Sequence, residues 1–440
     1  MNNIGISFEK FQSTNKGFLC IKDISSLKFE TFDQSTIKIY FDSFKNSKIF
    51  VLDSLHFYRT FCFLGKKYLS ELNIFDCKLF LNTYQNQLNI DLLQIAKEKY
   101  KINALYEYQK IEQIWKIQKS KNWKNIPFAI QKVFLEKISN ISFKAGNDFL
   151  KIYENEFDFK QKQYMIRMSE FLLSLVFLEQ NGIYSSDKIL KNPQYVYDNV
   201  VTGRLMNFEP ENFQVKSKKS FFEEYPSRFG KDGSILIADW KSIDFNVACA
   251  ISKEKILYEQ DVYKSFAKEI LNKDIISENE RSKYKNILLQ LLYGDHKSSP
   301  HLKILLKKYP NLFEFKNTFL SQNNDKTKYI VSWFGKRRFF DKDEKNRDFK
   351  FLNSLIQMTV ADLCKFGVIE IIKIFEEKKF KSVPIPYIVY DGFGFDIYNT
   401  ELEEIKEIIY TTLINNTIPT EFRQYVNFDI SFTINNNEKK

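Results

Sequence analysis

Apolar and polar residues along the chain follow patterns that predict both strands and helices. Short runs of β-favouring residues predict strands at 36–41, 48–52, 234–238, 329–340 (two strands around Gly335), 387–398 (two strands around a turn) and 428–433. Apolar residues at three- and four-residue spacing predict helices at 57–72, 89–99, 104–119, 127–138, 164–178, 351–377 and 400–415, with more between 253 and 320. The mixture predicts an α+β fold, and we see no internal repeat.

Two of the predicted strands deliver a carboxylate at their ends. The apolar run 234–238 is typical of a strand that is buried on both faces, and Asp239 follows it. Asp391 stands before Gly392 between two alternating apolar runs, which predicts a hairpin with Asp391 as the first turn residue. Each carboxylate alone is equally well explained as a turn former.

A basic stripe lies between the two carboxylates in the sequence. Arg281, Lys285, Leu289 and Tyr293 follow one another at four-residue spacing, so they share one side of a helix. The two cations can meet the phosphates of a nucleotide, and the tyrosine ring can stack on a base. An ordinary amphipathic helix with a basic face remains the alternative. Together with two carboxylates, the stripe predicts nucleotidyl transfer on two divalent metal ions.

Composition supports a partner that carries negative charge. The chain has 440 residues, of which 44% are hydrophobic and 28% charged, so it can form two to four domains with large cores. The net charge of +11 favours a polyanion, with nucleic acid as the first candidate, although a generally lysine-rich composition gives the same excess. The five cysteines have no paired spacing and the three histidines form no zinc pattern.

Five segments, in order, resemble motifs of the family A DNA polymerases, the family of bacterial DNA polymerase I. They are Thr202–Leu205 (TGRL), Asp239–Asp244 (motif A, DYSQIE), Arg281–Gly294 (motif B, RxxxKxxxFxxxYG), Asn353–Asp362 (NxPxQGTAAD) and Tyr390–Gly392, where motif C has HDE. The resemblance covers residues 200–400 and implies a palm, fingers and thumb fold with an antiparallel palm sheet. It also implies an N-terminal α/β domain of the RNase H-like, 3′–5′ exonuclease type.

The resemblance implies domain boundaries and site residues. The expected domains are 1–104 (degenerate exonuclease-like), 105–200 (helical thumb), 201–252 (first palm part), 253–345 (fingers) and 346–440 (second palm part). Asp239, Asp391 and the Trp240 backbone carbonyl are the implied metal ligands, for two Mg²⁺ ions with Mn²⁺ as an alternative. The implied nucleotide-binding residues are Arg281, Lys285, Tyr293, Asp244, Leu289 and Tyr263, the last in place of a phosphate-binding histidine. Arg204, Asn353 and Gln357 are the implied primer–template contacts.

Departures from the family pattern leave the accepted sugar open. The acid that excludes a 2′-hydroxyl is usually Glu but here is Asp244, and Leu289 replaces a Phe or Tyr. Motif C lacks its His and Glu, and its Asp-Gly-Phe-Gly also resembles the Asp-Ser-Phe-Gly of phage-type single-subunit RNA polymerases. The implied function is template-directed, primer-dependent DNA synthesis from dNTPs on primer–template DNA. An RNA polymerase or primase-like enzyme, or an inactive nucleic-acid-binding homologue, are the alternatives.

The sequence of the N-terminal region predicts a domain without proofreading exonuclease activity. Phe75-Asp76-Cys77 faintly resembles an exonuclease segment, but Tyr58 stands where an aspartate is expected, and Asp76 is equally well explained as a helix N-cap. The start of the chain has no signal-peptide pattern, and the longest apolar run, 171–178, is too short to span a bilayer. We expect a monomer in the cytoplasm of a bacterial cell or virus-infected host. A processivity or replisome protein is a further candidate partner, and no membrane association is expected.

Overall fold

The computed structural model describes residues 3–10, 16–85, 128–197, 200–209, 213–256, 261–294, 301–323, 328–340 and 347–435. Contacts divide the chain into two compact units, Met1–Phe177 and Leu178–Lys440. The helices predicted at 89–99 and 104–119 lie outside the described residues. Among the described residues, no helix is long and apolar enough to cross a membrane.

The first unit is built on a mixed five-stranded sheet in the order β3-β2-β1-β4-β5. Its strands are β1 (Asn3–Lys10), β2 (Gly17–Lys22), β3 (Leu27–Phe32), β4 (Lys48–Val51) and β5 (Ile74–Asp76). Strand β1 runs antiparallel to β2 and parallel to β4. The helices are α1 (Thr36–Ser43), α2 (Ser54–Phe61), η1 (Cys62–Leu64), α3 (Lys66–Ser70), α4 (Cys77–Gln85), α7 (Phe128–Glu156) and α8 (Phe159–Asn181), which continues past Phe177. Helix α7 packs against β1 and β2, and the unit is compatible with the predicted RNase H-like class.

Two element predictions in the first unit need correction. The strand predicted at 36–41 is helix α1, in which Ile37 and Phe41, one turn apart, are the buried residues. The Asp33 carboxylate accepts the Thr36 backbone N–H at 2.9 Å and so favours a helix start, which outweighs the β-branched composition. The helix predicted at 57–72 is broken into α2, η1 and α3, because the chain turns at Gly65 with a φ of 87°.

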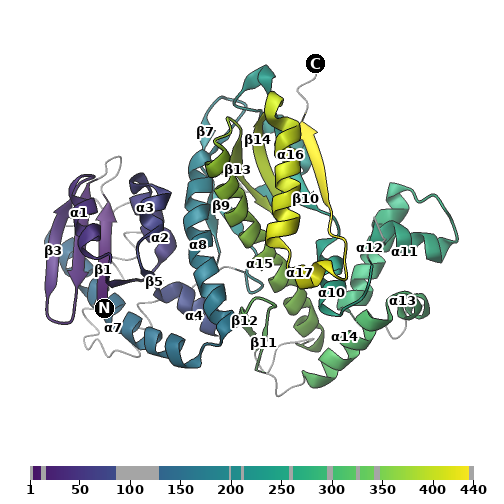
Figure 1. The fold of residues 1–440 in the computed structure, drawn as a ribbon, viewed down its shortest axis with the longest axis horizontal. Helices are drawn as coiled ribbons and strands as arrows, with labels where there is room; N and C mark the ends of the chain where they lie inside the picture. The colour runs from purple at the N-terminus through teal and green to yellow at the C-terminus, as the bar shows by residue number, and fades with distance from the viewer. Residues whose placement is uncertain are drawn as a thin grey trace. The chain divides into compact units, whose positions relative to one another are not determined.

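The second unit is organised around an antiparallel sheet in the order β13-β14-β10-β15 (Figure 1). Its strands are β10 (Gly233–Trp240), β13 (Val383–Val389), β14 (Gly392–Tyr398) and β15 (Ile430–Asn435). Every residue of β10 is buried except Asp239, which is partly exposed. The strand predicted at 234–238 is therefore confirmed, buried on both faces as its apolar pattern indicates.

Helices and short strands complete the second unit. The helices are α9 (Lys218–Glu224), α10 (Ile243–Ile251), α11 (Val262–Leu271), α12 (Glu278–Tyr293), α13 (Leu302–Lys308), α14 (Pro310–Gln322), α15 (Arg347–Lys378), α16 (Leu402–Thr411) and α17 (Thr420–Arg423), with shorter turns η3 (Phe213–Val215), η4 (Gly230–Asp232), η5 (Asn399–Glu401) and η6 (Thr412–Thr417). The short strands are β6 (Ile183–Tyr184), β7 (Leu190–Lys191), β8 (Gln194–Val196), β9 (Met206–Glu209), β11 (Tyr329–Val331) and β12 (Arg337–Phe339). The strand pair around Gly335 and the helix over 351–377 are confirmed. Helix α15 packs with α10, α12 and α14 and also contacts β13.

The β13–β14 hairpin is confirmed, but its register differs from the prediction by one residue. Val389 pairs with Gly392, so Tyr390 and Asp391 form the turn and Asp391 is its second residue. The positive φ, 56°, falls on Tyr390 and not on the glycine. The carbonyl of Tyr390 accepts a hydrogen bond from the buried Cys364 thiol at 3.3 Å, which holds this turn against α15.

Candidate active site

A cleft of about 420 Å³ in the second unit collects most of the side chains that the sequence singles out. Strand β10 ends in the cleft and α10 begins in it, while α11, α12, α15 and the β13–β14 turn complete its wall. The lining residues that the sequence predicts as site residues are Arg204, Asp239, Trp240, Asp244, Tyr263, Arg281, Lys285, Leu289 and Asp391.

Strand pairing brings Asp239 and Asp391 together. Asp239 pairs with Gly392, the first residue of β14, which directly follows Asp391. On its other side Asp239 pairs with Ser431, whose hydroxyl donates to the Asp239 carbonyl at 3.2 Å. A Cβ atom at position 392 would lie 3.2 Å from Asp239 Oδ1. The missing side chain of Gly392 therefore leaves space for the Asp239 carboxylate. The sequence predicts Gly392 only as a turn residue.

Lys218 supplies the cation that contacts Asp239. It is the first residue of α9, and its Nζ donates to Asp239 Oδ2 at 2.8 Å. Nothing in the sequence singles out Lys218, because it lies among several lysines and serines at 216–220 and belongs to no motif. Only the fold shows which of these lysines reaches the cleft.

Asp391 is a buried carboxyl in a cluster of negative charge. Burial, followed by the charges of Asp239 and Asp244, raises the pKa of Asp391 from 3.8 to about 7. Lys285 acts in the opposite direction but does not reverse the shift. A cation that entered between these carboxylates would relieve their repulsion.

Asp244 and Tyr293 each have a buried polar atom without a hydrogen-bond partner in the protein. Asp244 lies in the first turn of α10, and its Oδ1 is 3.7 Å from Arg204 Nη2, within ion-pair range but too long for a hydrogen bond. Burial raises the pKa of Asp244, while Arg204 and Lys285 lower it. Burial and the Asp244 charge raise the pKa of Tyr293. Asp244 Oδ1 and the Tyr293 hydroxyl are both buried and have no hydrogen-bond partner in the protein.

The basic stripe on α12 is held over an aromatic ring. Arg281 Nε donates to Asp261 Oδ2 at 2.6 Å, and Asp261 also caps α11. The Arg281 guanidinium carbon and Lys285 Nζ lie 5.3 and 5.5 Å from the centre of the Tyr263 ring. Tyr263 is buried, and its hydroxyl is hydrogen-bonded to Ser242, so the ring rather than the hydroxyl faces the cations.

Helix α12 is anchored at both ends. At its start, Ser277 and Glu280 form a reciprocal capping box. At its end, the buried Lys316 of α14 donates to the carbonyls of Leu291 and Gly294 at 2.8 and 3.0 Å. The sequence analysis also missed Lys316, which resembles any surface lysine of an amphipathic helix.

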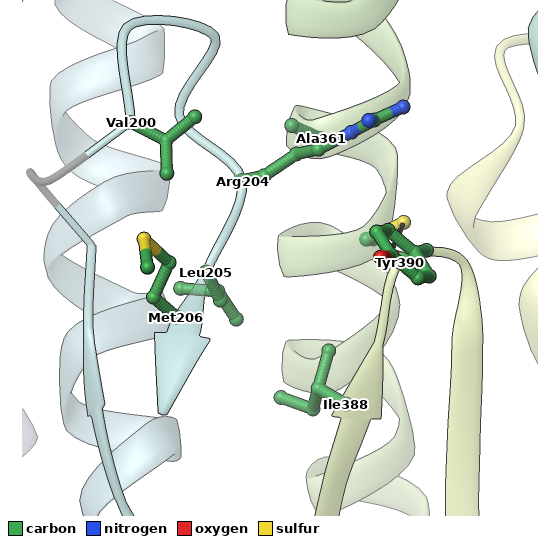
Figure 2. Close-up of a pocket in the computed structure, with 8 residues that line it drawn as sticks. Val200, Arg204, Leu205, Met206, Ala361, Ile388 and Tyr390 are labelled. Carbon is green, nitrogen blue, oxygen red and sulfur yellow. Dashed lines mark hydrogen bonds between the residues drawn. The ribbon is translucent and has the colours of Figure 1, made fainter. Parts of the chain in front are cut away.

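A second cavity of about 230 Å³ adjoins the cleft and shares Arg204, Ala361 and Tyr390 with it. Figure 2 shows Arg204 reaching from the loop before β9 towards Ala361 on α15, with Tyr390 at the tip of the hairpin. The Arg204 guanidinium carbon lies 5.8 Å from the centre of the Tyr390 ring, and Tyr390 is 58% exposed. Arg204 therefore contacts both the motif C turn and Asp244.

Asn353, Gln357 and Tyr293 are not among the residues that line these two cavities. Asn353 and Gln357 precede Ala361 on α15 at four-residue spacing, so they lie on the side of the helix that reaches the cleft. The Asn353 side-chain oxygen is buried without a protein partner. Asn353 and Gln357 thus lie beside the cleft rather than in it.

The donors around Asp239 fit a divalent cation. Two carboxylates, close in space, and a strand-end carbonyl at Trp240 are oxygen ligands of the kind that Mg²⁺ and Mn²⁺ prefer. The Lys218 ammonium already occupies a cation position at Asp239, and Gly392 leaves the space that a side chain would fill. Among the described residues, no three His, Cys, Asp or Glu side chains gather to hold a metal, so this set depends on the backbone oxygen and on substrate or water.

Comparison with protein families matches the DNA polymerase family A model to residues 185–438, more than half of the chain. The chain belongs to DNA polymerase family A. The matched region contains the whole antiparallel sheet of the second unit, and every residue of the cleft. Family A membership confirms the resemblance that the five motifs indicate.

Curated relatives of this family A chain are bacterial. The chain is 25% identical to DNA polymerase I of Lactococcus lactis subsp. lactis over 259 residues, which cover 50% of this chain and 28% of that protein. It is 24% identical to DNA polymerase I of Caldicellulosiruptor bescii and of Treponema pallidum, covering 50% of this chain and 29% and 25% of those proteins. The match therefore spans little more than a quarter of the length of these relatives.

A solved structure shows the same fold over nearly the whole chain. The POL domain of Pol1 from M. smegmatis, in complex with DNA primer–template and dNTP, aligns with 99% of this chain and 95% of that one, with a TM-score of 0.63 and 13% sequence identity. The α+β fold class of a family A polymerase is thus confirmed.

Asp76 in the first unit of this family A chain is a helix N-cap. Its Oδ1 accepts the Leu79 N–H at 2.9 Å, and its Oδ2 accepts the Ser54 N–H at 2.8 Å and the Ser54 hydroxyl at 2.6 Å. Burial, followed by the charge of Asp53, raises the pKa of Asp76 to about 7. Tyr58 is also buried, and its hydroxyl is hydrogen-bonded to Ser169. These contacts explain Asp76 without a metal, while the exonuclease resemblance stays a prediction.

Proposed function

We propose that this chain is a template-directed, primer-dependent DNA polymerase that transfers nucleotides from dNTPs to a primer 3′-hydroxyl. One observation carries the proposal. Asp239 lies on β10 and Asp391 in the turn directly before the neighbouring strand β14, and they share a cleft with Arg281 and Lys285 of α12. Nucleotidyl transfer needs this combination of oxygen ligands and phosphate-binding cations.

In this proposal the basic side chains of the cleft bind phosphates, and the acidic side chains bind metal ions. Arg281 and Lys285 bind the triphosphate, and the phosphates compete with Asp261 for the Arg281 guanidinium. Arg204 contacts the primer terminus from the loop before β9. Asp239, Asp391 and the Trp240 carbonyl would hold two divalent ions, which when bound lower the pKa of the primer hydroxyl and stabilise the leaving pyrophosphate. Asn353 and Gln357 on α15 face the primer–template.

The partner molecules follow from charge and from the structural neighbour. The solved POL domain was captured with primer–template DNA and dNTP, and the net charge of +11 suits a polyanion. Phosphate contacts release counterions, so binding of primer–template to this chain weakens as salt rises.

Sugar choice depends on Asp244 and its surroundings. Asp244 is one methylene shorter than the usual glutamate, and both its Oδ1 and the Tyr293 hydroxyl lack hydrogen-bond partners in the protein. These atoms could accept or donate to a 2′-hydroxyl, which favours ribonucleotide incorporation as the second candidate activity. DNA synthesis stays the first candidate, because a carboxylate is retained at 244 and the TGRL segment is intact.

A primer-extension assay tests the proposal. The full chain, primed DNA template and Mg²⁺ are combined with dNTPs in one arm and rNTPs in the other. Asp239→Asn and Asp391→Asn should each lower the extension rate at least a hundredfold, since each removes a metal ligand, while DNA binding measured by fluorescence anisotropy stays within about twofold. Asp232→Asn, at an exposed position, is the control of equal charge.

Four results of this assay test the candidate functions and the metal-ligand roles. Extension with dNTPs that both variants lose supports the polymerase, and efficient extension with rNTPs supports the second candidate. Extension that persists in either variant removes the metal-ligand roles. DNA binding without any extension by the unchanged chain identifies a nucleic-acid-binding homologue without catalysis.

A further inference from the structure

Lys218 contacts the carboxylate of Asp239, which is the proposed metal ligand at the end of β10. Its Nζ lies 2.8 Å from Asp239 Oδ2, while Oδ1 of the same carboxylate faces Gly392. The neighbouring cations have other partners: Arg204 pairs with Asp244, and Arg281 pairs with Asp261. Lys218 is thus the cation placed on the carboxylate at the end of β10.

The contact is built so that the side chain can leave while its helix stays. The Lys218 side chain is 42% exposed and that of Asp239 is 27% exposed, so water can replace either partner. Helix α9 is capped separately, by Ser217 accepting the Ser220 N–H at 3.1 Å. The lysine stem is a flexible four-carbon chain, and its release needs no change in the backbone.

An ammonium and a divalent ion on the same carboxylate repel each other. Both would lie within a few ångströms of Asp239 Oδ2, and a charge of +1 beside a charge of +2 at about 5 Å costs roughly a tenfold change in affinity even in water. We propose that Lys218 is an internal counter-ion of Asp239 that a divalent metal ion must displace, so that metal binding and release of Lys218 are coupled. This inference rests on the proposed function, because it takes Asp239 as a metal ligand.

The coupling has a consequence for the chain without metal. Lys218 neutralises Asp239 next to Asp391, and so stabilises the end of β10 while no metal is bound. The same contact lowers the affinity of the cleft for metal in the absence of nucleotide. Lys218 therefore sets the metal concentration at which the cleft fills.

Mn²⁺ binding to the full chain without nucleotide or DNA tests the proposal, with free Mn²⁺ measured by electron paramagnetic resonance at low ionic strength. Lys218→Met should bind Mn²⁺ on the order of tenfold more tightly than the unchanged chain. Lys218→Arg, which keeps the positive charge, should bind Mn²⁺ with the affinity of the unchanged chain. Lys219→Met is the matched control, since it removes the same charge from the next, exposed position of α9. It should leave the affinity unchanged.

A second set of variants links the effect to Asp239. In an Asp239→Asn background, Lys218→Met should no longer change Mn²⁺ affinity, because the carboxylate charge that attracts both cations has gone. Equal or weaker binding by Lys218→Met overturns the proposal and shows that Lys218 positions Asp239 instead; this outcome leaves the proposed function intact if Asp239→Asn still weakens Mn²⁺ binding. If Asp239→Asn leaves Mn²⁺ binding unaltered, both this proposal and the proposed function are overturned.

Discussion

At the scale of single residues, the cleft works against the stability of the fold. Burial, together with the charges of Asp239 and Asp244, raises the pKa of Asp391 to about 7. Arg204 and Lys285 offset this repulsion only in part. Such sites are retained for function at a cost in stability.

Asp391→Asn should stabilise the metal-free protein at high pH. The pKa of Asp391 is raised on folding from 3.8 to about 7, so the folded chain holds a proton that the unfolded chain releases. The stability contributed by this carboxyl is complete below about pH 4 and is lost as the pH rises through 7, with an upper bound of about 4 kcal/mol. Thermal unfolding in a chelator should show a higher Tm for the variant at pH 8, and a difference that shrinks towards pH 5.

The exposed Asp232→Asn variant is the control for that titration and should follow the unchanged chain at every pH. A Tm difference between Asp391→Asn and the unchanged chain that does not vary between pH 5 and pH 8 would contradict the buried, proton-holding state of Asp391.

At the scale of elements, α12 is a helix clamped at its two ends and open along one side. The capping box satisfies its first amide groups, and Lys316 satisfies carbonyls at its last turn. The stripe with Arg281 and Lys285 faces the cleft between these anchors. The anchors fix where the phosphate-binding cations stand, although neither anchor lines the cleft.

Lys316→Met should loosen the end of α12 without touching the cleft. The variant leaves the Leu291 and Gly294 carbonyls without the ammonium that they share, which costs about 1–3 kcal/mol in a buried setting. Amide hydrogen exchange should accelerate in residues 290–294, and the KM for nucleotide should rise more than kcat falls. Lys303→Met, at an exposed position of α13, should change neither. Unaltered exchange in the last turn would remove the anchoring role of Lys316.

At the scale of the whole molecule, the two units differ in what their carboxylates do. In the second unit Asp239 and Asp391 line an open cleft. In the first unit Asp76 is almost fully buried, and its oxygens accept backbone N–H groups and a serine hydroxyl. Among the described residues, Asp239 and Asp391 are therefore arranged to face a ligand, whereas the oxygens of Asp76 are used by the fold.

A mismatched primer should remain intact when it is incubated with the full chain, Mg²⁺ and no dNTP. Asp76→Ala should lower the Tm, because an N-cap contributes about 0.5–2 kcal/mol, and it should leave primer extension unchanged. Shortening of the primer by the unchanged chain, abolished in Asp76→Ala, would assign a catalytic role to Asp76.

The strongly patterned parts of the sequence predicted the structure well. The apolar run before Asp239, the hairpin around Asp391 and the four-residue stripe on α12 are local signals, and each corresponds to one element. Most of the predicted site residues line one cleft. The motifs that contain them lie on elements that the antiparallel sheet brings together.

The remaining features depend on contacts between distant segments, which a single sequence does not contain. Lys218 and Lys316 are ordinary lysines until the fold places one on a carboxylate and the other on a helix end. The role of Gly392 depends on which residue β10 places opposite it. Helix α1 was mistaken for a strand because eight residues carry too few turns for periodicity to show.

The central position of β10 has a consequence for how the protein is made. This strand pairs with β14 on one side and β15 on the other, and the Ser431 hydroxyl meets the Asp239 carbonyl across 192 residues of chain. During synthesis β10 therefore emerges as an apolar strand whose two neighbours have not yet been translated. Unpaired apolar strands recruit other chains, so yield in a cell and dependence on chaperones should be set by the strand that carries Asp239.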